Sequence, residues 1–127
     1  MNTIQISVGD VVMQAELNQS LTAQAIWDHL PITGSVNTWG DEIYFGIPVN
    51  LKEEPDAREE VEVGDLGYWA PGHAFCIFFG RTPASHGKEP RAASPVNVFG
   101  KVLGDVSPLR RVKSGSTIRI TRLGDSK

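Results

Sequence analysis

Six consecutive apolar residues, Ala74 to Phe79, constrain the fold of this chain more than any other feature. Gly72 and Gly80 bound this stretch, so it is too short for a typical helix, and it lacks the alternation that marks a strand with one solvated face. We therefore predict a strand buried on both faces. In a chain of 127 residues, one face of such a strand lines a barrel or sandwich, while a helix or loop covers the other.

Length and composition predict a single domain spanning residues 1–127. Cys76 is the only cysteine, which excludes an intrachain disulfide and fits a reducing compartment. The sequence has no cationic leader followed by an apolar segment, and no apolar run approaches the roughly 20 residues of a membrane span. We expect a soluble, cytoplasmic protein with no membrane partner.

The charge is close to balanced but unevenly distributed. A net charge of −3 argues against a nucleic-acid partner that binds by electrostatic attraction. Acidic residues gather in the segment from Lys52 to Glu62, and basic residues gather between Arg110 and Arg122. An acidic loop meeting a basic face is compatible with a homo-oligomer, although a solvated surface explains the same pattern.

Apolar periodicity predicts a mainly β fold. Ser20 caps an expected helix, because Ala23, Ile26, Trp27 and Leu30 recur at helical spacing before a proline. A short second helical turn is expected over residues 107–112. Strands are predicted at residues 3–8, 11–17, 32–39, 42–49, 61–63, 74–79, 96–103 and 117–123. Eight strands are enough to close a small β-barrel.

One long segment without periodicity, residues 81–95, contains three prolines and is predicted to be a loop. Loops of this length are uncommon in compact domains and are often functional. We therefore expect recognition groups on this segment.

Three collinear segments resemble the cyclophilins. Thr22-Ala-Gln-Ala-Ile-Trp-Asp-His-Leu30 is similar to that family's Thr-Ala-Glu-Asn-Phe helix, and Gly72-His-Ala-Phe-Cys-Ile77 to its Gly-Ser-Gln-Phe-Phe-Ile strand. Val96-Asn-Val-Phe-Gly-Lys-Val102 is close to the family's His-Val-Val-Phe-Gly-Lys-Val. The resemblance covers most of the chain and implies a closed eight-stranded cyclophilin-like β-barrel.

Other segments narrow the resemblance to the compact prokaryotic cyclophilin-like proteins, a group of unsettled function. They are Trp39-Gly-Asp-Glu-Ile-Tyr-Phe45, Gly64-Asp-Leu-Gly-Tyr-Trp-Ala-Pro-Gly72, Thr82-Pro-Ala-Ser85 and Ser94-Pro-Val-Asn97. The chain departs from typical cyclophilins at the residues that carry isomerase activity. Residues 39–49, where the family has its catalytic arginine, contain no arginine or histidine. The family's pocket glutamine, phenylalanine and histidine fall on Ala74, Cys76 and Val96.

What the resemblance preserves is an apolar concavity. We expect it to be walled by Ala74, Cys76 and Val96 and supplemented by Trp39, Glu42 and Tyr44, with Arg81 or His86 near its mouth. An inward-facing Glu42 would have a raised pKa and could anchor a ligand or act as an acid or base. A solvated Glu42 is the equally weighted alternative.

Other arrangements are weaker candidates. Cys76 and His73 lie three residues apart on an extended segment and point to opposite faces, so we interpret Cys76 as a buried hydrophobe. No histidine spacing matches a metal-ligand motif, and we expect no metal or cofactor. Tyr68 and Trp69 are interpreted as core and corner residues.

The sequence therefore predicts a protein that binds a small ligand or short peptide in a pocket and lacks the usual prolyl isomerase residues. Two alternatives remain. One is a prolyl isomerase with relocated donors, supplied by Arg81 or Arg91. The other is a small-molecule enzyme that uses Glu42 as acid or base.

Overall fold

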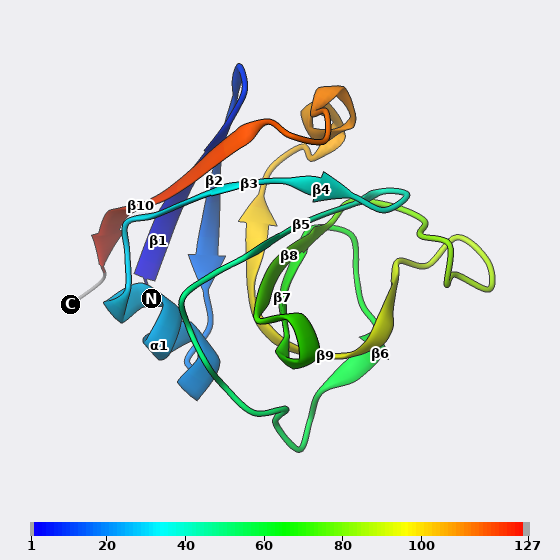
Figure 1. Ribbon diagram of the computed structural model, residues 1–127, viewed down its shortest axis with the longest axis horizontal. Helices are drawn as coiled ribbons and strands as arrows, with labels where there is room; N and C mark the ends of the chain where they lie inside the picture. The colour runs from blue at the N-terminus through cyan, green and yellow to red at the C-terminus, as the bar shows by residue number, and fades with distance from the viewer. Residues whose placement is uncertain (1, 126–127) are drawn as a thin grey trace.

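A computed structural model describes residues 2–125 of the chain. Within them the fold is mainly β, with one α-helix and two short 3-10 helices (Figure 1). The strands are β1 (Asn2–Val8), β2 (Val11–Leu17), β3 (Ile32–Ser35), β4 (Asn37–Thr38), β5 (Glu42–Gly46), β6 (Arg58–Glu60), β7 (Asp65–Trp69), β8 (Ala74–Phe78), β9 (Arg91–Leu103) and β10 (Thr117–Asp125). The helices are α1 (Leu21–Asp28), η1 (Ala70–Gly72) and η2 (Ser107–Arg111).

The strands form one curved sheet whose neighbours follow the order β3-β10-β1-β2-β9-β7-β8-β5-β4, with β6 paired to β9. The first and last strands of this path, β3 and β4, are separated in sequence only by Val36. No hydrogen-bonded ladder joins the two ends of the path within residues 2–125. The mainly β prediction is therefore confirmed, whereas the closed eight-stranded barrel is not.

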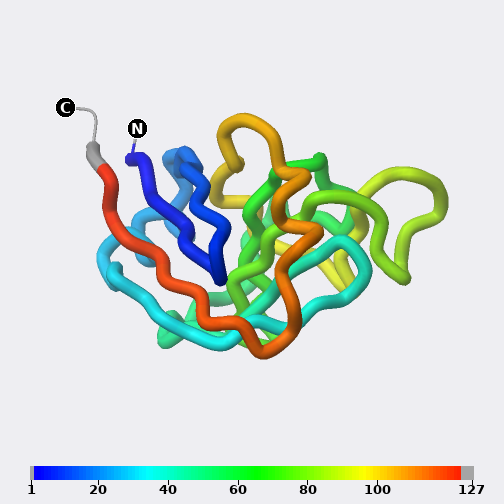
Figure 2. The backbone as a smooth tube through the Cα atoms, turned by 90° about the horizontal axis from the view of Figure 1, so that it is seen from above, coloured from blue at the N-terminus to red at the C-terminus, as the bar shows by residue number. Residues whose placement is uncertain are grey.

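The amino-terminal hairpin follows its alternating sequence. Val8 pairs with Val11 across a turn in which Gly9 adopts a φ of +58°, and the apolar residues of both strands other than Val12 are buried. β1 also pairs with β10, so Asn2 lies opposite Asp125 and the two ends of the described chain are neighbours (Figure 2). The predicted hairpin and final strand are confirmed.

Helix α1 is capped and docked as its sequence indicates. The Ser20 hydroxyl accepts a hydrogen bond from the Ala23 amide at 3.1 Å. Arg122 of β10 donates to the Trp27 carbonyl at 2.9 Å, and its guanidinium lies 5.0 Å from the centroid of the Trp27 ring. The helix ends at Asp28, slightly earlier than the periodicity predicts, although Leu30 is still buried.

Strand β8 is buried along its whole length, as predicted. Phe75 and Ile77 belong to the main core, where the Phe75 ring lies 5.2 Å from that of Phe45 and 5.0 Å from that of Phe99. Ala74, Cys76 and Phe78 project to the other face and join a second, smaller apolar cluster with Val61, Ala92 and Val96. The two faces of one strand therefore separate the core from the cluster that carries the site.

Several boundaries differ from the prediction. Residues 61–63 are not a strand, because β6 ends at Glu60 and a turn follows in which Gly64 adopts a φ of +94°. Strand β7 was not predicted. Strand β9 begins at Arg91, so the loop after β8 is shorter than expected, and Pro95 lies inside the strand, where a register shift in the pairing with β6 accommodates it. The predicted strand at 32–39 is divided at Val36.

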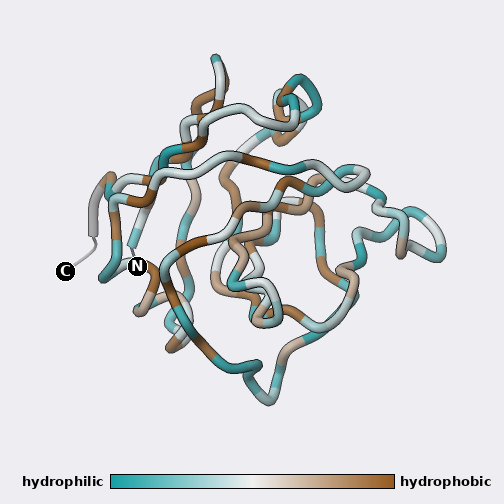
Figure 3. The backbone as a smooth tube through the Cα atoms, viewed as in Figure 1, coloured by the Kyte–Doolittle hydropathy of each residue, from teal (hydrophilic) through white to brown (hydrophobic). Residues whose placement is uncertain are grey.

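Hydrophilic residues gather in the peripheral connections, including the segment before β6 (Figure 3). Two carboxylates of the acidic segment from Lys52 to Glu62 pair with basic side chains of β9: Glu62 with Lys101 at 2.6 Å, and Glu60 with Arg91 at 3.1 Å. Residues 2–125 include no helix long and apolar enough to cross a membrane.

Candidate functional site

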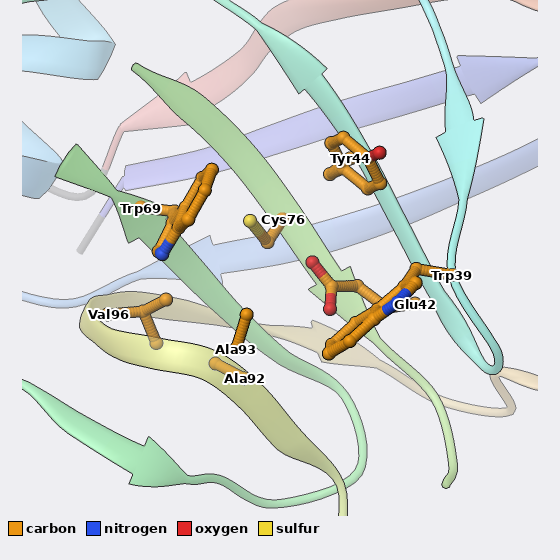
Figure 4. A pocket seen from close by; sticks show the side chains of 8 residues that line it. All are labelled: Trp39, Glu42, Tyr44, Trp69, Cys76, Ala92, Ala93 and Val96. Atoms are coloured by element: carbon orange, nitrogen blue, oxygen red, sulfur yellow. The ribbon is translucent and has the colours of Figure 1, made fainter. Parts of the chain in front are cut away.

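A cavity of about 260 Å³ opens on the face of the sheet that carries the second apolar cluster (Figure 4). The lining residues are Trp39, Glu42, Tyr44, Trp69, Cys76, Ala92, Ala93 and Val96. Cys76 and Glu42 lie among these side chains, with Trp69 on one side and Trp39 and Tyr44 on the other. An aliphatic wall formed by Ala92, Ala93 and Val96 completes the lining.

Antiparallel pairing of β5 with β8 sets the floor of the cavity. Tyr44 lies opposite Cys76 and Glu42 lies opposite Phe78. Because side chains alternate along a strand, Glu42 and Tyr44 share one face of β5, and Ile43 points into the main core. The alternation of side chains along the two paired strands thus brings the Glu42 carboxyl group, the Tyr44 phenol and the Cys76 thiol to one surface.

Trp39 is positioned by the tight turn between β4 and β5. Its amide donates to the Glu42 carbonyl at 2.9 Å, and the Glu42 amide donates back at 3.2 Å. Within this turn Gly40 adopts a φ of +59°, and a Cβ there would come within 2.8 Å of the Arg81 carbonyl oxygen. The turn is held further by the Asp41 amide, which donates to that carbonyl at 2.7 Å. Trp39 therefore forms a fixed side of the cavity.

Trp69 forms the opposing aromatic side. It lies opposite Ala74 in the ladder between β7 and β8, and its Nε1 donates to the Ser94 hydroxyl at 2.6 Å. Tyr68, the preceding residue, is fully buried and donates to the Val49 carbonyl at 2.6 Å. The core interpretation holds for Tyr68, whereas Trp69 is half-buried and lines the cavity.

The aliphatic wall comes from the first half of β9. It consists of Ala92, Ala93 and Val96. Val96 stands close to β7 because Gly67 has no side chain: a Cβ there would come within 2.8 Å of Val96 Cγ2. Trp69, Ala92 and Ala93 line the cavity but were not predicted as site residues from the sequence. The sequence does contain a signal for Trp69. Side chains alternate along residues 66–69, so Leu66 and Tyr68 face the main core while Gly67 and Trp69 face the cavity.

Glu42 dominates the electrostatics of the site. Its side chain is buried, with 6% of the residue exposed, and Oε1 has no hydrogen-bond partner among the described residues. Burial raises the pKa of this carboxyl group to about 7, against a smaller lowering by the Cys76 thiol. The solvated alternative for Glu42 is therefore wrong.

The Cys76 thiol shares this environment. Burial, and then the nearby Glu42 carboxyl, raise the pKa of the thiol well above its usual range. Its Sγ lies 3.9 Å from the Ala74 carbonyl oxygen, a distance typical of a weak thiol contact. The carboxyl group and the thiol influence each other's pKa, but Oε1 has no hydrogen-bond partner among the described residues.

Three residues predicted for the site do not line the cavity. Ala74 belongs to the same apolar cluster but is covered between Trp69 and Gly46, its partners on either side. Arg81 is exposed and contributes its carbonyl group to the turn at Asp41, and His86 is exposed on the loop after β8. The cavity brings together the other five, which are Trp39, Glu42, Tyr44, Cys76 and Val96. Whether any of the eight binds a ligand stays a prediction.

A second hollow, of about 280 Å³, is lined by Ile47, Pro48, Val49, Asn50 and His73. His73 adopts a left-handed φ of 49°, and its Nδ1 lies 3.3 Å from the Tyr68 hydroxyl, so it does not share the cavity with Cys76. No unsatisfied buried side-chain atom is found in this hollow among the described residues. Over the same part of the chain, no three His, Cys, Asp or Glu side chains are grouped to hold a metal ion.

A strongly curved, mainly β sheet with an apolar pocket on one face defines the class, and comparison with known proteins gives the family. The model of the family described as Cyclophilin-like matches residues 2–121, and the chain belongs to this family. The solution structure of the hypothetical protein AF2241 from Archaeoglobus fulgidus is similar, with 39% identity, a TM-score of 0.81 and coverage of 95% of this chain and 94% of that one.

A structure of McbB in complex with tryptophan is also similar, at 17% identity and a TM-score of 0.69. The match covers 98% of this chain and 46% of that chain, and at this identity it shows the fold alone. No curated protein matches this chain.

Proposed function

We propose that this protein binds a small molecule with an apolar body in the cavity lined by Trp39, Trp69 and Val96, and that Glu42 holds the ligand's one polar group. The observation that carries the proposal is the unsatisfied Oε1 of a buried carboxyl group that lines this cavity. Leaving a buried acceptor without a partner costs about 1–3 kcal/mol. A ligand that donates to Oε1 recovers that free energy, whereas an apolar ligand does not.

The dimensions and composition of the cavity support a small ligand. Its volume of about 260 Å³ is slightly below the roughly 300–1,000 Å³ of drug-sized ligand sites, which favours a small ligand. Such sites are mostly apolar, with a few polar groups that fix the ligand's orientation. The description of the hypothetical protein AF2241 specifies no ligand. The tryptophan in the McbB structure is a ligand of McbB and is not carried over to this chain. The proposal therefore depends on the chemistry of the cavity.

A fragment screen by NMR tests this proposal on the full chain. We expect fragments to shift the amide and indole resonances of residues around the cavity, Trp39 and Trp69 among them. Glu42→Gln should weaken a fragment that donates to Oε1 by about 1–3 kcal/mol. Glu53→Gln is the matched control, because Glu53 is an exposed carboxylate outside the lining. A screen in which no fragment binds at the cavity contradicts the proposal.

A second candidate function is acid–base chemistry on a bound small molecule. It is favoured by one observation, the pKa of about 7 at Glu42, because proton transfer is most effective when the pKa of the group lies near the working pH. Turnover of a ligand that the screen identifies, lost in Glu42→Gln, would establish this function. Binding without turnover leaves Glu42 as an anchor.

The third candidate, a prolyl isomerase with relocated donors, has less support. Arg91 donates to Glu60 and Glu89 at 3.1 Å each, and the Arg81 side chain is exposed outside the lining. Neither arginine therefore reaches the cavity as a donor.

We further propose that the sheet forms a closed barrel, in which β3 and β4 are continuous through Val36. We also propose that the protein is cytoplasmic. The single buried cysteine supports a reducing compartment.

A further inference from the structure

We propose that the ligand of this cavity is a small aromatic amine in its ammonium form, with at least one N–H and without a carboxylate or phosphate group. This inference rests on the proposed binding function and specifies the ligand class. It follows from the walls of the cavity, from the charges that the lining lacks, and from the atom that Glu42 leaves unsatisfied.

The walls favour an aromatic cation. Trp39, Tyr44 and Trp69 lie around Glu42 and Cys76, and the remaining side is the aliphatic wall, where Ala92 and Ala93 present only methyl groups (Figure 4). Aromatic rings attract ammonium groups through their quadrupoles and pack against other aromatic rings. A ligand that combines a ring with an ammonium group satisfies both preferences.

The lining excludes anions. It contains no lysine, arginine or histidine among the residues that the structure describes. Arg91, next to Ala92 in sequence, is engaged by Glu60 and Glu89, and the Trp69 N–H is already donated to Ser94. A bound carboxylate would be desolvated beside the Glu42 carboxyl group without a counter-charge, which disfavours it strongly. Amino acids should therefore bind less tightly than the corresponding amines.

The unsatisfied atom selects an N–H donor. Oε1 of Glu42 accepts hydrogen bonds only, as long as the carboxyl group is ionised. A primary ammonium group carries three N–H donors, whereas a quaternary ammonium group carries none. Both are attracted by the aromatic walls and by the carboxylate charge, but only the primary ammonium satisfies the buried acceptor.

Matched indole probes separate these contributions. Titrations of the full chain at pH 8, followed by NMR, would use tryptamine, its N,N,N-trimethyl ammonium derivative, neutral 3-ethylindole, indole-3-propionate and tryptophan. We expect tryptamine to bind about 10- to 100-fold more tightly than 3-ethylindole or the trimethyl derivative. Indole-3-propionate should bind most weakly, and tryptophan should bind more weakly than tryptamine.

Two variants identify the responsible group. Glu42→Gln should reduce the affinity for tryptamine to within about threefold of that for 3-ethylindole, because the charge-assisted hydrogen bond is lost. The affinity for 3-ethylindole should change little in this variant, which shows that the cavity is intact. Glu53→Gln, at an exposed carboxylate, should leave all affinities unchanged.

The inference and the proposed function can fail separately. Equal or tighter binding of 3-ethylindole, indole-3-propionate or the trimethyl derivative overturns the amine inference, while cavity binding itself stands. The same holds if other fragments bind at the cavity and tryptamine does not. If no fragment of any class binds there, the proposed function fails and the inference fails with it.

Discussion

Tyr44 lies directly opposite Cys76 in the antiparallel ladder between β5 and β8. Because Glu42 precedes Tyr44 by two residues, its carboxyl group projects from the same face and reaches the surface that carries the thiol. Ile43, which lies between Glu42 and Tyr44, projects to the other face and is buried in the main core. The register between β5 and β8 thus forms the floor of the cavity and places the Glu42 carboxyl group where burial raises its pKa.

The first prediction concerns the pH dependence of stability. The pKa of Glu42 rises from 4.5 to about 7 on folding, so the folded state binds this proton more tightly than the unfolded state. The contribution to stability is fully present below pH 4.5, is lost as the pH rises towards 7, and is constant above that. At about 1.4 kcal/mol per pKa unit, the loss is on the order of 3–4 kcal/mol.

Glu42→Gln removes this titration, so it should be more stable than the wild type at pH 8 and should lose that advantage by pH 4. Urea unfolding of the wild type and of Glu42→Gln between pH 4 and pH 8 measures the difference in their free energies of unfolding. Carboxylates that titrate in both proteins cancel in this difference, so it reports on Glu42. Glu53→Gln should follow the wild type. A difference between wild type and Glu42→Gln that does not vary with pH would refute a buried, titrating Glu42.

The second prediction is that the native Cys76 thiol is inert. Only 2% of the residue is exposed, and the thiolate needed for reaction is suppressed because the pKa of the thiol is raised. A thiol reagent at pH 8 should label the folded protein slowly, at a rate that rises as urea opens the structure. Since the chain has one cysteine, the signal reports on this site alone. Rapid stoichiometric labelling without urea would contradict the prediction.

Much of the fold follows from local pattern. The alternation in residues 3–17 gives the hairpin, Ser20 gives the helix start, and the apolar run at β8 gives the strand buried on both faces. The same reasoning, with the family resemblance, placed Trp39, Glu42 and Cys76 around one concavity. These signals are local or periodic, so no long-range contact was needed to see them.

What the sequence did not reveal depends on long-range contacts. The prolines of residues 81–95 predict a loop that includes Ala92 and Ala93, yet pairing with β6 at Arg91 and Val96 extends β9 through them. That loop was expected to carry Arg81 and His86 to the cavity. Instead its path is set by the Thr82 hydroxyl, which donates to the Arg91 carbonyl, and by the Ser85 hydroxyl, which donates to the Glu89 carbonyl. Hydrogen bonds of this kind, between a side chain and the backbone within a loop, leave no periodic pattern in the sequence.

The third prediction is that the protein lacks appreciable prolyl isomerase activity. Isomerases of the resembled family present a donor, an arginine, to the twisted imide in the transition state. The segment that corresponds, residues 39–49, has no arginine or histidine, and the described cavity lining has no cationic side chain. A protease-coupled assay with a proline peptide should give the uncatalysed rate, alongside a typical cyclophilin as positive control. Catalysis at a rate like that of the control would show that donors have been relocated.

The last prediction concerns the contact that sets the aliphatic wall. A methyl group at Gly67 would come within 2.8 Å of Val96 Cγ2 and 3.0 Å of Val96 Cβ, in a strand buried on this face. Gly67→Ala should therefore destabilise the protein by about 1–3 kcal/mol through overpacking. Gly46→Ala in β5 is the matched control, because a methyl group at Gly46 would meet no other atom within 4 Å, and this variant should be tolerated.

Val96→Ala supplies the space that the added methyl group needs. By itself it leaves a void and lowers the free energy of unfolding, but combined with Gly67→Ala it should relieve the clash. We expect the double variant to be more stable than the sum of the single effects implies, with a coupling of about 0.5–3 kcal/mol in a urea-unfolding cycle. Strictly additive effects would mean that β7 and β9 do not approach each other at these residues, and the cavity would then have no aliphatic wall at Val96.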